Sequence, residues 1–379
     1  INAGGRLTGR AGKYTIGALA MQTSELAVST EDVASGLIPT TNFGVARVKR
    51  DILRRSNIGF IGTYRSNALD GGGSNGLFGV DGNFTFFQNL DINTYYAKSS
   101  TPGLEGDDES YMGKLEYGGD LIGVEATYLA VDENFSPEVG FLRREDMRKS
   151  YGQFRYSPRP RSIEAIRQFG FEGSFNNVTN SLGLLETRIG KFEFRTQFES
   201  GDSFSFEYGR NYEFLDEEFE ISDDIILPIG GYNFNEFEYR YRFGPQRRVS
   251  GMAFFTHGSF YSGNRKSVTI FSRAEITRQF SIEPRLSQNW VDLLEGSFNT
   301  TLIAVRANYM FTPRAFIGAL FQYNSDGDSL SSNIRFRWEY RPGSDIYVVY
   351  SDGRNTAYTG FPSLENRSLV FKVTRLFRF

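Results

Sequence analysis

Cysteine is absent from this sequence, and no run of about 18 apolar residues occurs in it. The chain therefore has no disulfide, thiol nucleophile or zinc–thiolate site, and no helix that spans a membrane. Histidine occurs once, as His257, and 42 basic residues nearly balance 45 acidic ones. This balance gives no global attraction to nucleic acid. No phosphate-binding loop or zinc motif is present, so we expect neither a cofactor nor an enzyme.

Aromatic residues are abundant, with 36 Phe and 21 Tyr but 2 Trp. The mean hydropathy of −0.39 is that of a soluble protein. A strand that crosses an outer membrane needs only about 9–11 residues, and every second one faces a polar lumen. Low hydropathy and membrane insertion are therefore compatible.

Apolar and charged residues alternate over long segments. In 334–341 the even positions are apolar, and the odd positions hold Arg335, Arg337, Glu339 and Arg341. The segments 192–199, 203–208 and 232–243 alternate in the same way, apart from one slip near Asn235. Successive side chains of a strand point to opposite faces, so one face is aromatic and the other charged. A soluble sandwich also alternates, but its inner face favours Val, Ile and Leu.

The pattern predicts an all-β transmembrane antiparallel barrel of about 20 to 22 strands in a single domain, 1–379. The predicted strands are 2–10, 13–25, 41–53, 56–67, 76–88, 90–100, 109–118, 120–133, 147–157, 162–176, 182–199, 203–216, 231–244, 249–261, 266–278, 280–293, 298–311, 314–325, 331–341, 344–353 and 366–379. Pro284 lies inside one of them and suggests a bulge.

The connections alternate between short turns and long loops. The long ones are 26–40, 68–75, 101–108, 134–146, 217–230 and 354–365. Outer-membrane barrels have short periplasmic turns and longer extracellular loops, which orients the chain. This strand count is odd, whereas single-chain bacterial barrels have even counts. Either the count is wrong by one or an upstream strand is missing, and we favour a missing strand and a complete barrel of about 22. No signal peptide is visible, so we also expect an export signal before Ile1.

The last strand ends in Phe379, with Phe377, Val373 and Phe371 on the same face. Such an end resembles the signal that the barrel-assembly machinery reads, so Phe377 and Phe379 are the candidate assembly residues.

Charged residues on the polar faces are candidates for lining the lumen. They are Arg47, Lys49, Arg155, Glu193, Arg195, Glu236, Glu238, Arg240, Arg242, Arg335, Arg337 and Glu339. They either tune the selectivity of a conducting pore or only join neighbouring strands.

Other polar residues give weaker signals. We interpret His257 as a lumen or rim residue, because no orienting acid accompanies the nearby Ser259. Acidic clusters such as 107–109 and 216–220 match no EF-hand. We expect them to keep loops solvated or to bridge lipopolysaccharide through divalent ions, and we predict no defined metal site.

Four stretches resemble a family of bacterial outer-membrane barrels of unassigned function. They are 42–59, 135–144, 340–350 and the C-terminal end, of which the first two are the more specific. In that family the barrel commonly follows a periplasmic domain similar to family 9 carbohydrate-binding modules. The resemblance implies a bacterial outer-membrane location, an N-terminal periplasmic domain upstream of this sequence and no established activity.

Two functions remain open. The first is passage of a solute or polymer through the lumen, which in a barrel this wide needs a plug or a partner protein. The second is a structural anchor or scaffold for an upstream domain, with loops such as 26–40 or 217–230 packed inside. Expected partners are outer-membrane lipid, lipopolysaccharide and the assembly machinery.

Overall fold

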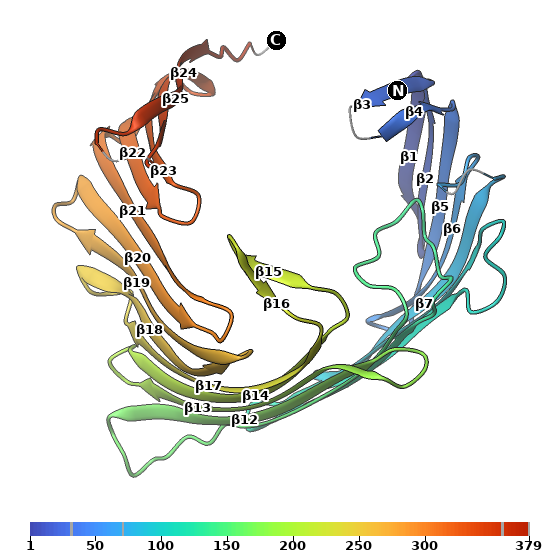
Figure 1. The fold of residues 1–379 in the computed structure, drawn as a ribbon, viewed down its shortest axis with the longest axis horizontal. Coiled ribbons are helices and arrows are strands. Elements are labelled where there is room, and N and C mark those ends of the chain that lie inside the picture. Colours follow the sequence, from blue (N-terminus) through green and yellow to red (C-terminus); the bar gives the residue numbers. More distant parts are fainter. Residues whose placement is uncertain (31–32, 70–71, 358–359, 378–379) are drawn as a thin grey trace. The chain divides into compact units, whose positions relative to one another are not determined.

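The computed structural model describes residues 1–379 except 31–32, 70–71, 358–359 and 378–379, and for 27–30 and 33–38 it describes the backbone alone. Within the described residues every regular element is a β-strand, and 21 of the 25 strands belong to one antiparallel sheet (Figure 1). None of these residues forms a helix of the length and hydropathy that a membrane span requires. The predicted all-β antiparallel class is confirmed, whereas closure into a barrel stays a prediction.

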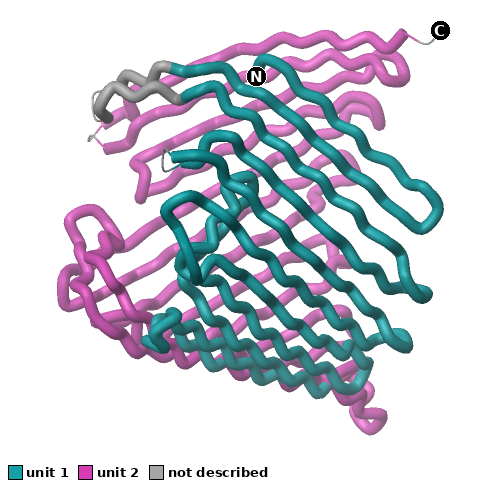
Figure 2. The backbone as a smooth tube through the Cα atoms, turned by 90° about the vertical axis from the view of Figure 1, so that its right-hand side faces the viewer, with its two compact units in different colours: residues 1–156, 172–190 teal, residues 157–171, 191–379 magenta. Residues whose placement is uncertain are grey.

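The chain divides into two compact units, 1–156 with 172–190 and 157–171 with 191–379 (Figure 2). Unit 1 is an antiparallel meander in which each large-sheet strand pairs with the next. Its strands are β1 Ala3–Ala11, β2 Tyr14–Thr23, β5 Thr41–Ile52, β6 Ser56–Arg65, β7 Asn75–Phe86, β8 Leu90–Ser100, β9 Glu109–Gly118, β10 Ile122–Val131 and β11 Met147–Tyr156. The separate hairpin β3 Leu26–Thr30 and β4 Val33–Ile38 lies within the predicted loop 26–40.

Unit 2 repeats this meander from β14 to β25. Its strands are β14 Ser203–Leu215, β17 Gly230–Phe243, β18 Val249–Phe260, β19 Gly263–Glu275, β20 Phe280–Asp292, β21 Ser297–Thr312, β22 Ala315–Asn324, β23 Ser329–Arg341, β24 Ser344–Asn355 and β25 Ser363–Val373. The hairpin β15 Phe219–Ser222 and β16 Ile225–Leu227 lies within the predicted loop 217–230. Strands β12 Ile166–Thr179 and β13 Leu185–Phe198 are each divided between the units.

Each predicted strand range corresponds to one strand of the large sheet, with ends that differ by a few residues. Two of the predicted loops contain the hairpins β3–β4 and β15–β16, which the sequence pattern missed. These hairpins are short, and neither shows the strong aromatic alternation of the long strands.

Pro284 makes no bulge, contrary to the prediction. The β20–β21 register runs through it without a shift, but the β19–β20 ladder has no pair between Phe271↔Arg285 and Ala274↔Ile282. Proline has no backbone N–H to donate, so the ladder is interrupted on one side only.

The last strand is shorter than predicted, because β25 ends at Val373 instead of Phe379. Its partner β24 begins at Ser344, and the backbone pairing ends where Asp345 and Thr374 exchange hydrogen bonds. Phe377 therefore lies beyond the strand with 63% of its surface exposed. Phe379 lies outside the described residues.

Each unit has an aromatic face and a polar face, because the register aligns alternate residues across its strands. In unit 1, Phe60 and Phe78 belong to the aromatic face, and Arg47 and Asp81 to the polar face. In unit 2, the aromatic face follows the pairs Tyr239↔Phe255, Ile270↔Leu286 and Leu286↔Ile303.

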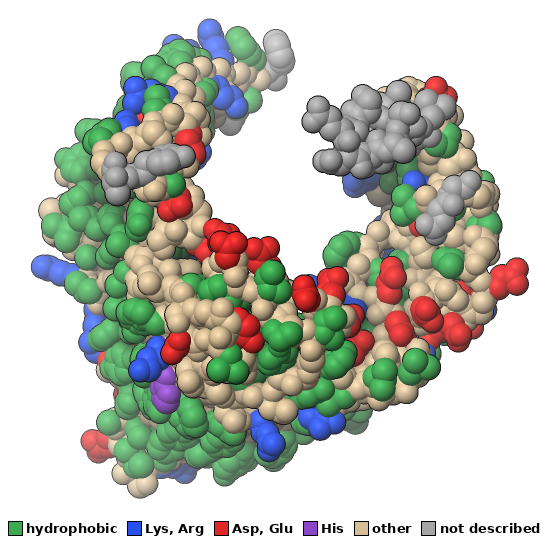
Figure 3. All heavy atoms as spheres, viewed as in Figure 1, with side chains coloured by type: hydrophobic (Ala, Val, Ile, Leu, Met, Phe, Trp, Pro, Cys, Tyr) green, Lys and Arg blue, Asp and Glu red, His purple; other side chains and the backbone are tan. Residues whose placement is uncertain are grey.

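The aromatic faces are exposed. In unit 1, Phe60 and Phe78 are 51% and 54% exposed, and in unit 2 Phe321 and Trp338 are 47% and 46% exposed. Hydrophobic side chains crowd along β18 to β22 (Figure 3). A soluble protein rarely exposes apolar surface on this scale, so these faces need an apolar environment.

Candidate solute-facing surface

The predicted lumen-lining residues occur in both units. Arg47, Lys49 and Arg155 belong to unit 1, and the other nine belong to unit 2. Within each strand that carries several of them, they share the polar face, as the alternation requires.

In unit 1, Arg47 on β5 forms an ion pair with Asp81 on β7, with 2.6 Å between Nη2 and Oδ1. Lys49 lies two residues further along the same face of β5. Arg155 donates from Nη2 to the carbonyl of Gly119 at 2.7 Å and so holds the turn between β9 and β10. Further along the polar face, Lys114 bridges Glu116 at 2.9 Å and Glu125 at 3.1 Å.

In unit 2, several predicted residues pair along one strand. Glu193 pairs with Arg195 at 2.8 Å, and Glu238 pairs with Arg240 at 2.5 Å. Residues two positions apart share a face, which permits these contacts. Such pairs neutralise charge locally without joining neighbouring strands.

Other predicted residues pair across strands with partners that the sequence pattern missed. Glu236 on β17 pairs with Arg265 on β19, and Arg337 on β23 pairs with Asp345 on β24 at 2.8 Å. Glu339 accepts a hydrogen bond from the N–H of Gly343 in the β23–β24 turn at 2.9 Å.

Arg242 and Arg335 form no ion pair with any residue that the structure describes. Arg242 lies beside a group of polar-face arginines that the sequence pattern missed, namely Arg273, Arg285 and Arg306. Their strands, β19 to β21, alternate less clearly, because Pro284 and Lys266 interrupt the apolar positions. Counting every second residue outward from Thr269 and Ser287 would have found Arg273, Arg285 and Glu283.

The loop 132–146 of unit 1 folds over the polar face. The Nδ2 of Asn75, which is fully buried, donates to the Ser136 carbonyl at 2.8 Å and to Thr101 Oγ1 at 2.7 Å. The Ser136 N–H donates to Ser99 Oγ at 3.0 Å. Glu138, with a side chain only 1% exposed, pairs with Arg65 at 3.4 Å.

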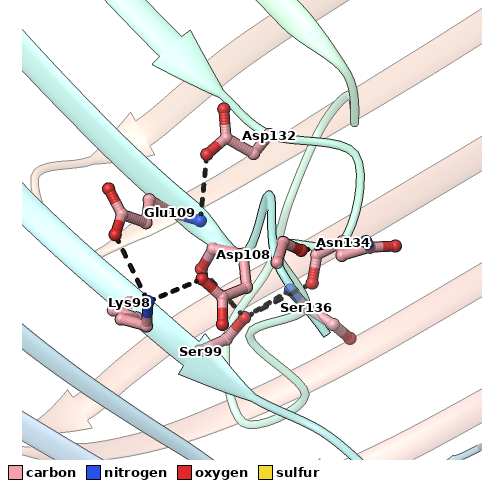
Figure 4. A network of polar contacts seen from close by, with 8 residues as sticks. Lys98, Ser99, Asp108, Glu109, Asp132, Asn134 and Ser136 are labelled. Atoms are coloured by element: carbon pink, nitrogen blue, oxygen red, sulfur yellow. Dashed lines mark hydrogen bonds and ion pairs between the residues drawn. The ribbon is translucent and has the colours of Figure 1, made fainter. Parts of the chain in front are cut away.

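Three acidic residues of this region also have partners (Figure 4). Lys98 bridges Asp108 at 3.0 Å and Glu109 at 3.3 Å. Asp132 accepts the Glu109 N–H at 3.2 Å and pairs with Arg148 at 2.5 Å. Two of the three residues in the acidic cluster 107–109 are therefore paired with Lys98 of β8.

Phe135 anchors the same loop in an apolar cluster. It is 6% exposed and packs with Ala97 of β8 and Val131 of β10, both on the polar face. The stretch 135–144, one of the more specific parts of the family resemblance, thus begins at this anchor.

The hairpin β15–β16 covers part of the polar face of unit 2. Leu227 is fully buried and Ile225 is 9% exposed, and both cluster with Val291 and Leu293. Phe298, which pairs with Val291, packs against the same cluster.

The interruption of the apolar alternation near Asn235 is explained by aromatic packing on this covered part of the polar face. The β14–β17 register is continuous, so Phe234 and Phe237 lie on opposite faces. Phe234 is 7% exposed and its ring contacts Phe260 and Tyr261 on the polar face. Burial raises the pKa of Tyr261 in the β18–β19 turn, and the Glu213 carboxylate that accepts its hydrogen bond adds to this shift.

His257 lies on the aromatic face, so the predicted lumen position is wrong. Its ring stacks on Phe237 at 5.3 Å and on Tyr239 at 5.9 Å, centroid to centroid. It is three residues from the end of β18, which agrees with a place near a rim. Among the described residues no group of three His, Cys, Asp or Glu side chains is arranged to hold a metal ion.

The turn between β13 and β14 contains a buried acid. Asp202 is 6% exposed, and its carboxylate accepts hydrogen bonds from the Gly244 N–H at 2.7 Å and the Tyr241 O–H at 3.1 Å. It also forms an ion pair with Arg247 at 2.7 Å. The Gly244 hydrogen bond, with help from Tyr241 and Arg247, lowers the pKa of this carboxyl against the opposing effect of burial.

No family model and no curated protein matches the chain. Among solved structures it is similar to the ferric-catecholate import receptor Fiu from Escherichia coli K12 in its open form, with TM-score 0.39 and 7% identity over 97% of this chain and 71% of that one. It is also similar to the ferric yersiniabactin uptake receptor FyuA from Yersinia pestis, with TM-score 0.30 and 9% identity over 93% of this chain and 58% of that one.

Proposed function

We propose that this chain is a bacterial outer-membrane β-barrel whose polar face lines a path for a solute. One observation carries the proposal, namely a long antiparallel sheet with one exposed aromatic face and one charged face. Backbone groups in a lipid environment must be paired internally, and a closed sheet is the β-structure that satisfies them. Outer-membrane lipid would cover the aromatic faces.

The exposure of arginine side chains on the polar face favours transport over a barrel filled by its own side chains. Arg242 and Arg335 are exposed and form no ion pair with a described residue. Arg273 and Arg306 each lie near a glutamate, but their side chains stay 56% exposed. A barrel filled by its own side chains would pair or bury such groups, because an unpaired buried charge is costly.

The anchor function has its own supporting observation. The hairpin β15–β16 and the loop 132–146 both lie over polar faces, as an anchor with inward-packed segments requires. In this second candidate the chain would hold an upstream domain at the membrane without a conducting path.

Single-channel conductance of the purified chain in a planar bilayer, in a salt gradient, separates the two. We expect steady, ion-selective conductance. Silence of protein whose folding is verified by heat-modifiable gel mobility would overturn the unaided channel and favour the anchor. A variant that lacks 219–227 then tests the hairpin as a plug, because an anchor stays silent without it.

A further inference from the structure

The polar face of unit 2 contains a cavity of about 490 Å³ near the β17–β18 turn. Four arginines line it, Arg242, Arg273, Arg285 and Arg306, together with the single acid Glu283. Its volume falls in the range of small-molecule sites.

The register explains why a hollow forms there. One row across the strands runs from Arg242 through Met252, Phe271 and Arg285 to Ala304. The next row includes the pairs Ser250↔Arg273 and Glu283↔Arg306. The small side chains of Ser250 and Ala304 leave space that the long arginines surround.

Three of the four arginines are available to a ligand. Arg242 and Arg285 form no ion pair with a described residue, and Arg306 lies 4.0 Å from Glu283, at the limit of an ion pair. Arg273 pairs with Glu275 at 3.2 Å. The Arg285 guanidinium lies over the Phe271 ring at 4.7 Å, a contact that orients it without neutralising its charge.

An adjacent cavity of about 470 Å³ shares Arg242 but differs in charge. Its other arginines are neutralised, since Arg167 pairs with Glu199, Arg195 with Glu193 and Arg240 with Glu238. The cavity that Arg285 lines therefore has more uncompensated positive charge, because Arg285 has no carboxylate partner among the described residues and Arg306 has only a distant one.

We infer that this cavity binds a small organic polyanion whose carboxylate, phosphate or sulfate groups are held by the arginines. Guanidinium groups bind such oxyanions through paired hydrogen bonds. Met252, Phe271 and Leu320 also line the cavity and provide an apolar surface for the body of the ligand. The inference deepens the proposed function by naming its substrate class, and its transport role rests on that function.

Calorimetric titration of the full chain in detergent micelles with inorganic pyrophosphate tests the binding. We expect the Arg285→Gln variant to bind at least 10-fold more weakly. The matched control is Arg335→Gln, which removes another exposed arginine from the same face outside the cavity. We expect this control to change affinity less than 2-fold. Glu283→Gln, which removes the acid that repels an anion, is expected to bind several-fold more tightly.

Equal loss in Arg285→Gln and Arg335→Gln would mean attraction to the charged face as a whole and would overturn the site. No binding by folded wild-type protein would overturn it as well. Because the titration needs no membrane current, a silent bilayer with intact pyrophosphate binding refutes the channel and leaves the site standing.

Discussion

At the residue scale, Asp202 joins two turns of unit 2, because its carboxylate accepts hydrogen bonds from Gly244 and Tyr241 and pairs with Arg247. Its folded pKa lies below its unfolded value of about 3.9. A depressed pKa contributes stability that is present above the unfolded pKa and is lost as the pH falls through the folded pKa.

We therefore predict that Asp202→Asn lowers the temperature at which the folded gel band disappears at pH 7. The difference from wild type should be smaller at a pH below the unfolded value of about 3.9, because this stabilisation is lost as the pH falls towards the folded pKa. Asp216→Asn, in an exposed loop, is the control and should change neither value. A constant difference at both pH values would contradict the electrostatic role.

His257 shows the limit of reasoning from a single residue. Its identity suggested a polar environment, whereas the strand register placed it between Phe237 and Tyr239 on the aromatic face. Its position two residues after Phe255 correctly predicts the aromatic face, since residues two apart in a strand share a face.

At the element scale, the hairpin β15–β16 depends on Leu227. We predict that Leu227→Ala weakens hairpin docking by about 2–5 kcal/mol, because it leaves a cavity in the cluster with Val291. Hydrogen exchange of 219–227, followed by mass spectrometry, should become faster.

The control is the neighbouring Ile226→Ala, whose side chain is 47% exposed. Its exchange should stay close to that of wild type. If both variants lose protection equally, the hairpin is not held by the apolar cluster.

The loop 132–146 depends on Asn75. Asn75→Ala removes two hydrogen bonds and leaves buried partners unsatisfied, which costs about 1–3 kcal/mol. We predict that trypsin cleaves after Arg143 or Arg144 roughly ten-fold faster, since a change of about 1.4 kcal/mol alters an opening equilibrium ten-fold.

Asn93→Ala on the polar face of β8 serves as the control for this loop. Among the described residues Asn93 has no side-chain hydrogen bond to the loop, so its loss should leave the cleavage rate near wild type. Faster cleavage of both variants would indicate general loosening of unit 1 instead of release of the loop.

At the scale of the whole molecule, both tryptophans report on the aromatic face. Trp290 and Trp338 are the only two in the sequence, and they are 48% and 46% exposed. We predict that brominated lipid quenches their fluorescence strongly in reconstituted vesicles, whereas aqueous iodide quenches weakly. Variants in which one of the two tryptophans is replaced by Phe separate the two signals. Strong quenching by iodide without quenching by brominated lipid would contradict a lipid-covered face.

The sequence by itself determined the strands and their two faces. Alternation within 334–341 or 203–208 is a local property, because the backbone geometry of a strand sends successive side chains to opposite sides. The turn at Pro342 and Gly343 was equally local, since Gly343 adopts a φ of 76° that glycine accepts without strain.

Only the tertiary structure decided which segments cover the polar faces and which charges meet. Arg47 pairs with Asp81, and Glu236 with Arg265, across an intervening strand, so these contacts depend on the register of two strand pairs at once. The arginine-lined cavity likewise needs Ser250 and Ala304 brought between Arg242, Arg285 and Arg306. Hydrogen bonding between strands sets these distances, and no single strand contains them.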